Sequence, residues 1–296
     1  MDSYFSKSGL CHPSDNVGAV IAVSEHADRS GKDFSTALAI AYQVETALIV
    51  AAQFLAPGFD LTTALMYSIG AGLSRAFGLD EAKTSAAVEI SRAAGIPLLV
   101  VWTTPISQWK GLNSSQVAFG CAHGFLLASR GVTGPKNVTE GPSGLAPLLG
   151  KTIHIDWDKQ QLDCFDRLAL KTYNPSRPSW PSSACSSRAR PTRLIRPRSS
   201  AYGRMSSTTP TTHRRWAFRS EDRRPHEGRR RPKSPVLAAV AAQDGDVQTA
   251  QLEPRRIERP NVQGLLRRVE VRADDRLSAR YPGEFPSHVT VRLEGG

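Results

Sequence analysis

Apolar residues recur with helical spacing through the first half of the chain, from Ser14 to about Arg130. Capping residues precede these periodic runs, and glycine or proline follows them, as at the ends of helices. We predict helices over residues 17–26, from Asp33 to just before Pro57, from Asp80 to Gly95 and from Ser114 to Gly131, with Ser14 and Asp15 capping the first. The first half is therefore expected to be mainly helical.

The periodic pattern stops after Tyr173. Residues 174–243 are rich in Arg, Pro and Ser and keep no apolar period, so no packed structure is expected there. Order is expected to return at about Asp244, with a short helix beginning at Pro260 and strands over residues 269–272 and 289–292. The predicted fold class is α+β: a mainly helical domain over residues 1–173 and part of a smaller α/β domain over residues 244–296.

Small residues inside the helical runs predict close helix packing, because they let two helices approach each other. Gly70-Ala71-Gly72 is the clearest case. It has Arg75 where a dinucleotide-binding fingerprint needs a third glycine, and it lies within a helix instead of after a strand. We interpret it as a packing site.

The net charge of +11 would ordinarily indicate an anionic partner such as nucleic acid. However, the stretch from Asn174 to Lys233 holds fifteen Arg and one Lys against three acidic residues, a local charge of +13, so the remaining residues sum to −2. Basicity is thus confined to one segment. A disordered nucleic-acid-binding linker in a non-enzymatic protein is the alternative function that this segment suggests, but it lacks regularly interleaved aromatic residues. Nucleic acid is not the expected partner.

The compartment expected from the sequence is the cytoplasm. The four cysteines form no C-x-x-C pair, and the N-terminus has no secretory signal pattern. The longest apolar stretch, residues 36–56, contains Gln43 and Glu45, which favours a buried helix over a membrane span.

The stretch Cys11-His12-Pro13-Ser14-Asp15-Asn16 carries the first candidate chemistry. Pro13 holds His12 in an extended conformation just before a helix, near free amide groups and the positive end of the helix dipole. Such a histidine can meet a carboxylate or simply support the structure.

Further motifs follow in a fixed order. They are Ser30-Gly31-Lys32-Asp33-Phe34, the segments 58–63 and 108–112, and then 244–247, 259–262 and 277–282. Together with His12-Pro13-Ser14-Asp15-Asn16, they resemble the MmgE/PrpD family over about residues 1–173 and 244–296. The resemblance implies a helical domain joined to a smaller α/β domain, a homodimer, and an active site between the domains.

The resemblance also implies a hydro-lyase similar to 2-methylcitrate dehydratase, acting in propionate metabolism without a cofactor or metal. Removing water from a small tricarboxylate requires a base, an acid and groups that hold the carboxylates. His12 is the expected acid or base, and Lys110 the expected partner of a substrate carboxylate. Ser3 occupies the place of a family threonine beside the active site and is expected to bind substrate. Tyr281 occupies the place of an active-site tyrosine from the smaller domain and is expected, with His12 and Lys110, to be catalytic. Lys110 could equally be solvated, and Tyr281 could pack at a strand edge.

Three departures from the family pattern predict impaired activity. Leu61 stands where the family has a second active-site histidine, and leucine cannot transfer a proton. In the family pattern a helical segment with a catalytic aspartate precedes the position of Asp2, and we expect this segment to be missing here. The family pattern also has an active-site lysine after Lys171-Thr172-Tyr173-Asn174, where this chain has the Arg-rich segment instead. An unstable product with exposed apolar surface is a further alternative.

A pair of compensating frameshifts would explain fifteen Arg beside one Lys, since GC-rich DNA read out of frame yields Arg, Pro and Ser. Translating the other two frames of the gene across codons 174–243 is expected to reveal family-like sequence. Its absence from both frames would contradict the hypothesis.

Overall fold

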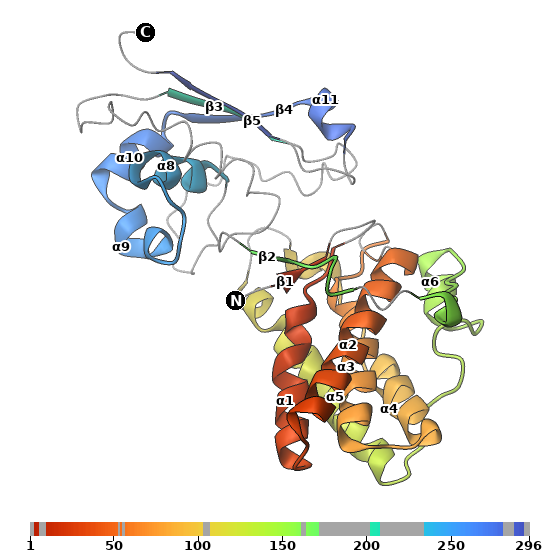
Figure 1. Ribbon diagram of the computed structural model, residues 1–296. Helices are drawn as coiled ribbons and strands as arrows, with labels where there is room; N and C mark the ends of the chain where they lie inside the picture. Colours follow the sequence, from red (N-terminus) through yellow and green to blue (C-terminus); the bar gives the residue numbers. More distant parts are fainter. Residues whose placement is uncertain are drawn as a thin grey trace. The chain divides into compact units, whose positions relative to one another are not determined.

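The computed structural model describes residues 3–5, 10–52, 54, 57–102, 107–160, 164–171, 202–207, 234–280 and 287–292. It contains two compact units, Met1–Leu170 and Lys171–Gly296 (Figure 1). The division lies close to the boundary predicted after Tyr173.

The first unit is mainly helical, which confirms the predicted class of this part of the chain. Its α-helices are α1 (Val17–His26), α2 (Gly31–Ala52), α3 (Thr62–Phe77), α4 (Glu81–Ala93), α5 (Asn113–Ser129) and α6 (Leu145–Leu149). Its 3-10 turns are η1 (Pro13–Asn16), η2 (Leu99–Trp102), η3 (Gln108–Gly111) and η4 (Trp157–Lys159). Strand β1 (Ser3–Tyr4) pairs antiparallel with β2 (Ala169–Leu170).

Local capping explains several helix ends. The Asp80 carboxylate accepts a hydrogen bond from the Lys83 amide at 2.8 Å, as expected for the start of α4. Gly78 ends α3 in the left-handed conformation, with φ of 85°. The expected capping of α1 by Ser14 and Asp15 is wrong: these residues lie in η1, which runs directly into α1, and Asn16 at the helix start makes no side-chain capping bond.

Helix α3 lies at the centre of this unit and is buried along most of its length. It packs against α1, α2, α4 and α5. By length and composition α2 could cross a membrane, yet half of its apolar window is buried within the unit. Because α2 packs against α3, its environment is that of a core helix.

Gly72 permits the closest approach among α1, α2 and α3. A Cβ atom at this position would lie 3.0 Å from both the Ala41 Cβ and a Val20 methyl carbon. These contacts support a helix-packing role for the Gly70-Ala71-Gly72 stretch.

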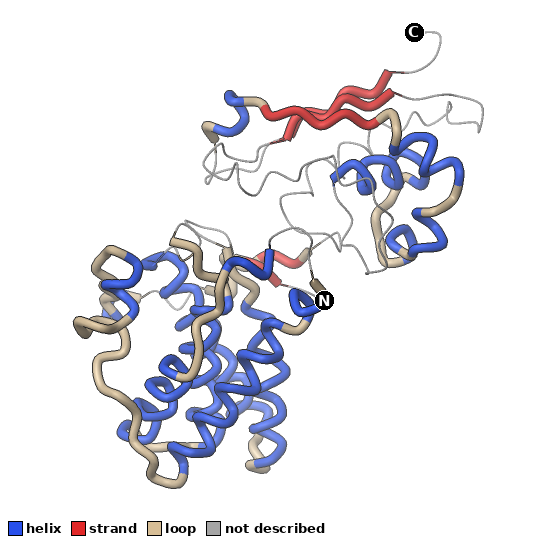
Figure 2. Tube along the Cα trace, turned by 180° about the vertical axis from the view of Figure 1, so that it is seen from behind, coloured by secondary structure: helices blue, strands red, loops and turns tan. Residues whose placement is uncertain are grey.

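The second unit contains a three-stranded sheet and short helices (Figure 2). The strand order is β4 (Val269–Ala273), β3 (Tyr202–Ser207), β5 (Ser287–Arg292), with β3 parallel to β4 and antiparallel to β5. Its helices are α8 (Ser234–Asp244), η7 (Ala250–Leu252), α9 (Pro254–Ile257), α10 (Pro260–Leu266) and α11 (Asp275–Ser278). Helix α8 packs against α10 and β4. The α+β class is therefore confirmed.

Two parts of residues 174–243 correct the prediction of no packed structure. Strand β3 lies inside this segment, and its backbone pairs with both neighbouring strands. Helix α8 begins at Ser234, ten residues before the expected return of order at Asp244, and buries Leu237 and Val240. Backbone pairing requires no apolar alternation, so an Arg-rich and Ser-rich composition conceals such a strand.

We predict that Gly72→Leu destabilises the first unit by about 1–3 kcal/mol or more, because the added side chain must displace α1 or α2. Gly120→Leu is the matched control, since a Cβ at Gly120 meets nothing within 4 Å. Urea unfolding followed by circular dichroism compares the two variants. Equal stability of both variants would contradict the packing role.

Candidate active site

His12 lies at the start of η1, which packs against α2, α3 and α5. Its Nδ1 is 3.1 Å from the backbone oxygen of Ser3. A carbonyl oxygen can only accept a hydrogen bond, so Nδ1 must carry the proton. In the neutral imidazole this places the basic lone pair on Nε2. The contact therefore selects the tautomer and the ring orientation that an acid/base histidine needs.

Ser3 is held on several sides. Strand pairing places it opposite Leu170. Its amide donates to the Ser14 hydroxyl oxygen at 3.1 Å, and its own hydroxyl accepts from the Ser14 amide at 3.0 Å. Ser3 also hydrogen-bonds Tyr42 and is only 6% exposed. The structure thus uses Ser3, predicted to bind substrate, to join the N-terminal strand to the turn that carries His12.

Asp60 forms the centre of a second polar cluster, at the start of α3. One carboxylate oxygen accepts from the Thr62 amide at 3.1 Å, from the Thr62 hydroxyl at 2.7 Å and from the Asn113 side chain at 3.0 Å. The other oxygen accepts from the Trp102 indole N–H. These four donors satisfy both oxygens of a side chain that is only 1% exposed.

Lys110 extends this second cluster. Its Nζ lies 4.3 Å from the centre of the Trp102 ring, a cation–π contact. Since the Trp102 indole N–H donates a hydrogen bond to Asp60, the position of Lys110 depends indirectly on the buried carboxylate. The predicted carboxylate-binding lysine is thereby placed on the segment that follows α4, beside the start of α3.

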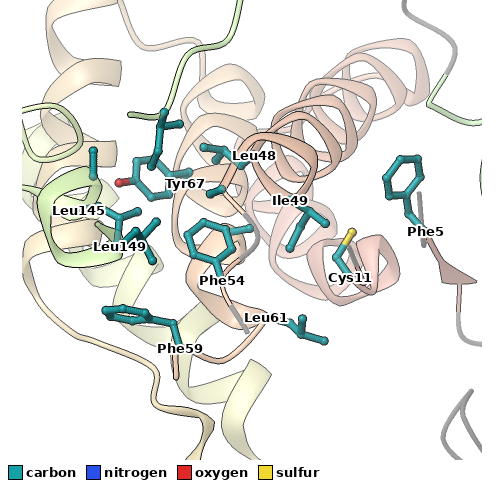
Figure 3. Close-up of a cluster of buried hydrophobic side chains, with 14 residues drawn as sticks. Phe5, Cys11, Leu48, Ile49, Phe54, Phe59, Leu61, Tyr67, Leu145 and Leu149 are labelled. Atoms are coloured by element: carbon teal, nitrogen blue, oxygen red, sulfur yellow. The ribbon is translucent and has the colours of Figure 1, made fainter. Parts of the chain in front are cut away.

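Leu61 directly follows Asp60 in the sequence but belongs to a buried apolar cluster (Figure 3). The cluster also contains Cys11, the residue before His12, together with Phe54 and Phe59. Leu61 is 6% exposed. Position 61, where the sequence resemblance led us to expect a proton-transferring histidine, is therefore occupied by a side chain that contributes apolar packing.

Glu45 is the candidate site residue that sequence reasoning missed. It lies in the middle of α2 and is 2% exposed. Asn16 Nδ2 donates to its Oε2 at 2.6 Å, and the Cys11 thiol also hydrogen-bonds it. Burial, reinforced by the nearby negative charge of Asp15, raises the pKa of Glu45 to about 7. A lone carboxylate in the apolar stretch 36–56 was the available signal.

The predicted site residues therefore fall into three groups. His12 and Ser3 are in direct contact, whereas Lys110 belongs to the cluster around Asp60. Tyr281 lies outside the described residues. Within the described part of the chain, no group of three His, Cys, Asp or Glu side chains is arranged to hold a metal ion.

The fold and the site together define an α+β protein whose helical domain carries a candidate acid/base histidine on a turn before a helix. Family models match both ends of the chain: the MmgE/PrpD N-terminal domain over residues 1–157 and the MmgE/PrpD C-terminal domain over residues 234–296. The chain belongs to the MmgE/PrpD family. The second match begins at the same residue as α8. A search of curated proteins found no match.

The raised pKa of Glu45 predicts a specific dependence of stability on pH. Below its unfolded pKa, near 4.5, both states are protonated and the full stability is present. As the pH rises to about 7, the folded state retains a proton that the unfolded state loses, so the free energy of unfolding falls by about 3 kcal/mol from this group.

Glu45→Gln is expected to abolish this component of the decline, as measured by urea unfolding at several pH values. The exposed Glu25→Gln is the control and should keep the wild-type slope. A Glu45→Gln slope equal to that of the wild type would show that Glu45 does not hold the proton.

Proposed function

We propose that this protein is a hydro-lyase that removes water from a small tricarboxylate of the 2-methylcitrate type. The contact between His12 Nδ1 and the Ser3 carbonyl carries this proposal, because it orients an imidazole with Nε2 as its basic nitrogen. Membership of the MmgE/PrpD family supports lyase chemistry on such substrates.

In the proposed reaction, His12 Nε2 removes the proton next to a substrate carboxylate. The electron pair of the broken C–H bond forms the C=C double bond, and the C–O bond to the hydroxyl group breaks. The departing oxygen takes up a proton and leaves as water. Lys110, a fixed positive charge beside Trp102, is the proposed partner of a substrate carboxylate.

Leu61 explains why this activity should be weak. A positioned acid or base contributes about 10²-fold or more to the rate, and leucine supplies neither. The departing hydroxyl must then take its proton from solvent water. The proposed enzyme is thus a hydro-lyase that retains one proton-transfer group, His12, and has an apolar side chain, Leu61, in place of another.

We predict that Leu61→His raises the rate of 2-methylcitrate dehydration by about 10²-fold, because it restores a group able to transfer a proton. Ultraviolet absorbance of the unsaturated product measures the rate. Leu61→Gln is the matched control: it is polar and of similar size but cannot act as an acid or base.

Adding His12→Gln to Leu61→His should remove the gain. Absence of dehydration by both the wild type and Leu61→His would contradict the proposed function. An equal gain in Leu61→Gln would show that polarity, and not proton transfer, is what position 61 lacks.

A further inference from the structure

The side-chain amide of Asn16 connects Glu45 to the turn that carries His12. Its Nδ2 donates both to Glu45 Oε2 at 2.6 Å and to the backbone oxygen of Pro13 at 3.0 Å. Its Oδ1 accepts from the Ser68 hydroxyl at 2.8 Å. Asn16 is fully buried, and both hydrogens of its amide nitrogen are engaged. The amide therefore has a single satisfied orientation, which links η1 to α2 and α3.

Pro13 immediately follows His12 in the sequence. The hydrogen bond to the Pro13 carbonyl therefore restrains the backbone next to the residue that carries the imidazole. Removing the Glu45 acceptor would leave one Asn16 hydrogen without a partner in a buried site. The conformation of the His12 turn thus depends on a side chain 29 residues away from Asn16 in the sequence.

The charge on Glu45 also acts on its surroundings. Among the described residues, the titratable groups that interact with it are Cys11, His12 and Asp15, from the segment around η1, and Tyr42, from its own helix α2. A positive charge on His12 favours the ionised form of Glu45, so the two side chains are electrostatically coupled. Ser68, on α3, completes the Asn16 contacts without a titratable group.

We propose that Glu45 is a positioning residue for His12: its carboxyl group holds Asn16, which holds the His12 turn, and its ionisation changes the electrostatic field at the imidazole. The catalytic meaning of this role rests on the proposed function, whereas the physical coupling does not. The pKa of about 7 means that the Glu45 carboxyl group changes charge near neutral pH, and this change would alter the electrostatic field at the His12 imidazole.

The test is a nuclear magnetic resonance titration of the full-length chain with ¹³C-labelled histidine, between about pH 5 and 9. The His12 resonance is identified by its loss in His12→Gln. In the wild type it should follow two steps, because the imidazole reports both its own proton and that of Glu45. In Glu45→Gln it should follow one step.

Glu89→Gln is the matched control, since Glu89 is a second buried glutamate but lies in α4 and bonds Ser85 and Lys136. It should leave both His12 steps unchanged. Two steps persisting in a folded Glu45→Gln would overturn the proposal, as would loss of one step in Glu89→Gln.

Infrared difference spectroscopy of the wild type keeps the proposal testable if Glu45→Gln fails to fold. The carbonyl band of a protonated carboxyl group should disappear over the same pH range as the second His12 step, and a different range would overturn the coupling. Neither measurement requires turnover. A chain that lacks dehydratase activity but shows the two steps would contradict the proposed function alone.

Discussion

The buried side chain of Asn16 is the constraint on which the candidate site depends. Buried amide groups must be hydrogen-bonded, and this one satisfies that requirement by joining η1 to α2 and α3. The turn held in this way positions His12, and Ser14 in the same turn holds Ser3. The Asn16 contacts add to the Ser3–Ser14 hydrogen bonds, so the turn is held both to the first strand and to the helices.

Two buried carboxylates support the site in different ways. Asp60 accepts four hydrogen bonds from neutral donors, and one of them fixes Trp102 beneath Lys110. Glu45 receives fewer donors and lies near Asp15, so burial favours its protonated form. The first is suited to a role in orientation, and the second to a role that changes with pH.

Family membership and chemistry depend on different residues in this protein. Matches at both ends of the chain establish the MmgE/PrpD family. The proposed chemistry depends on a few side chains, and Leu61 is the clearest case: the residue fits its apolar cluster with Cys11 and Phe59, but it cannot transfer a proton.

Sequence alone determined the features that depend on near neighbours. Caps and apolar period predicted α4 and α10 close to their observed bounds, and the ordered motifs predicted the family. Only the tertiary structure decided the role of Glu45, because its pKa depends on burial and on contacts from Cys11, Asp15 and Asn16. It also decided the pairing of β3 with β4 and β5, since backbone hydrogen bonds between distant segments leave no periodic mark in an Arg-rich sequence.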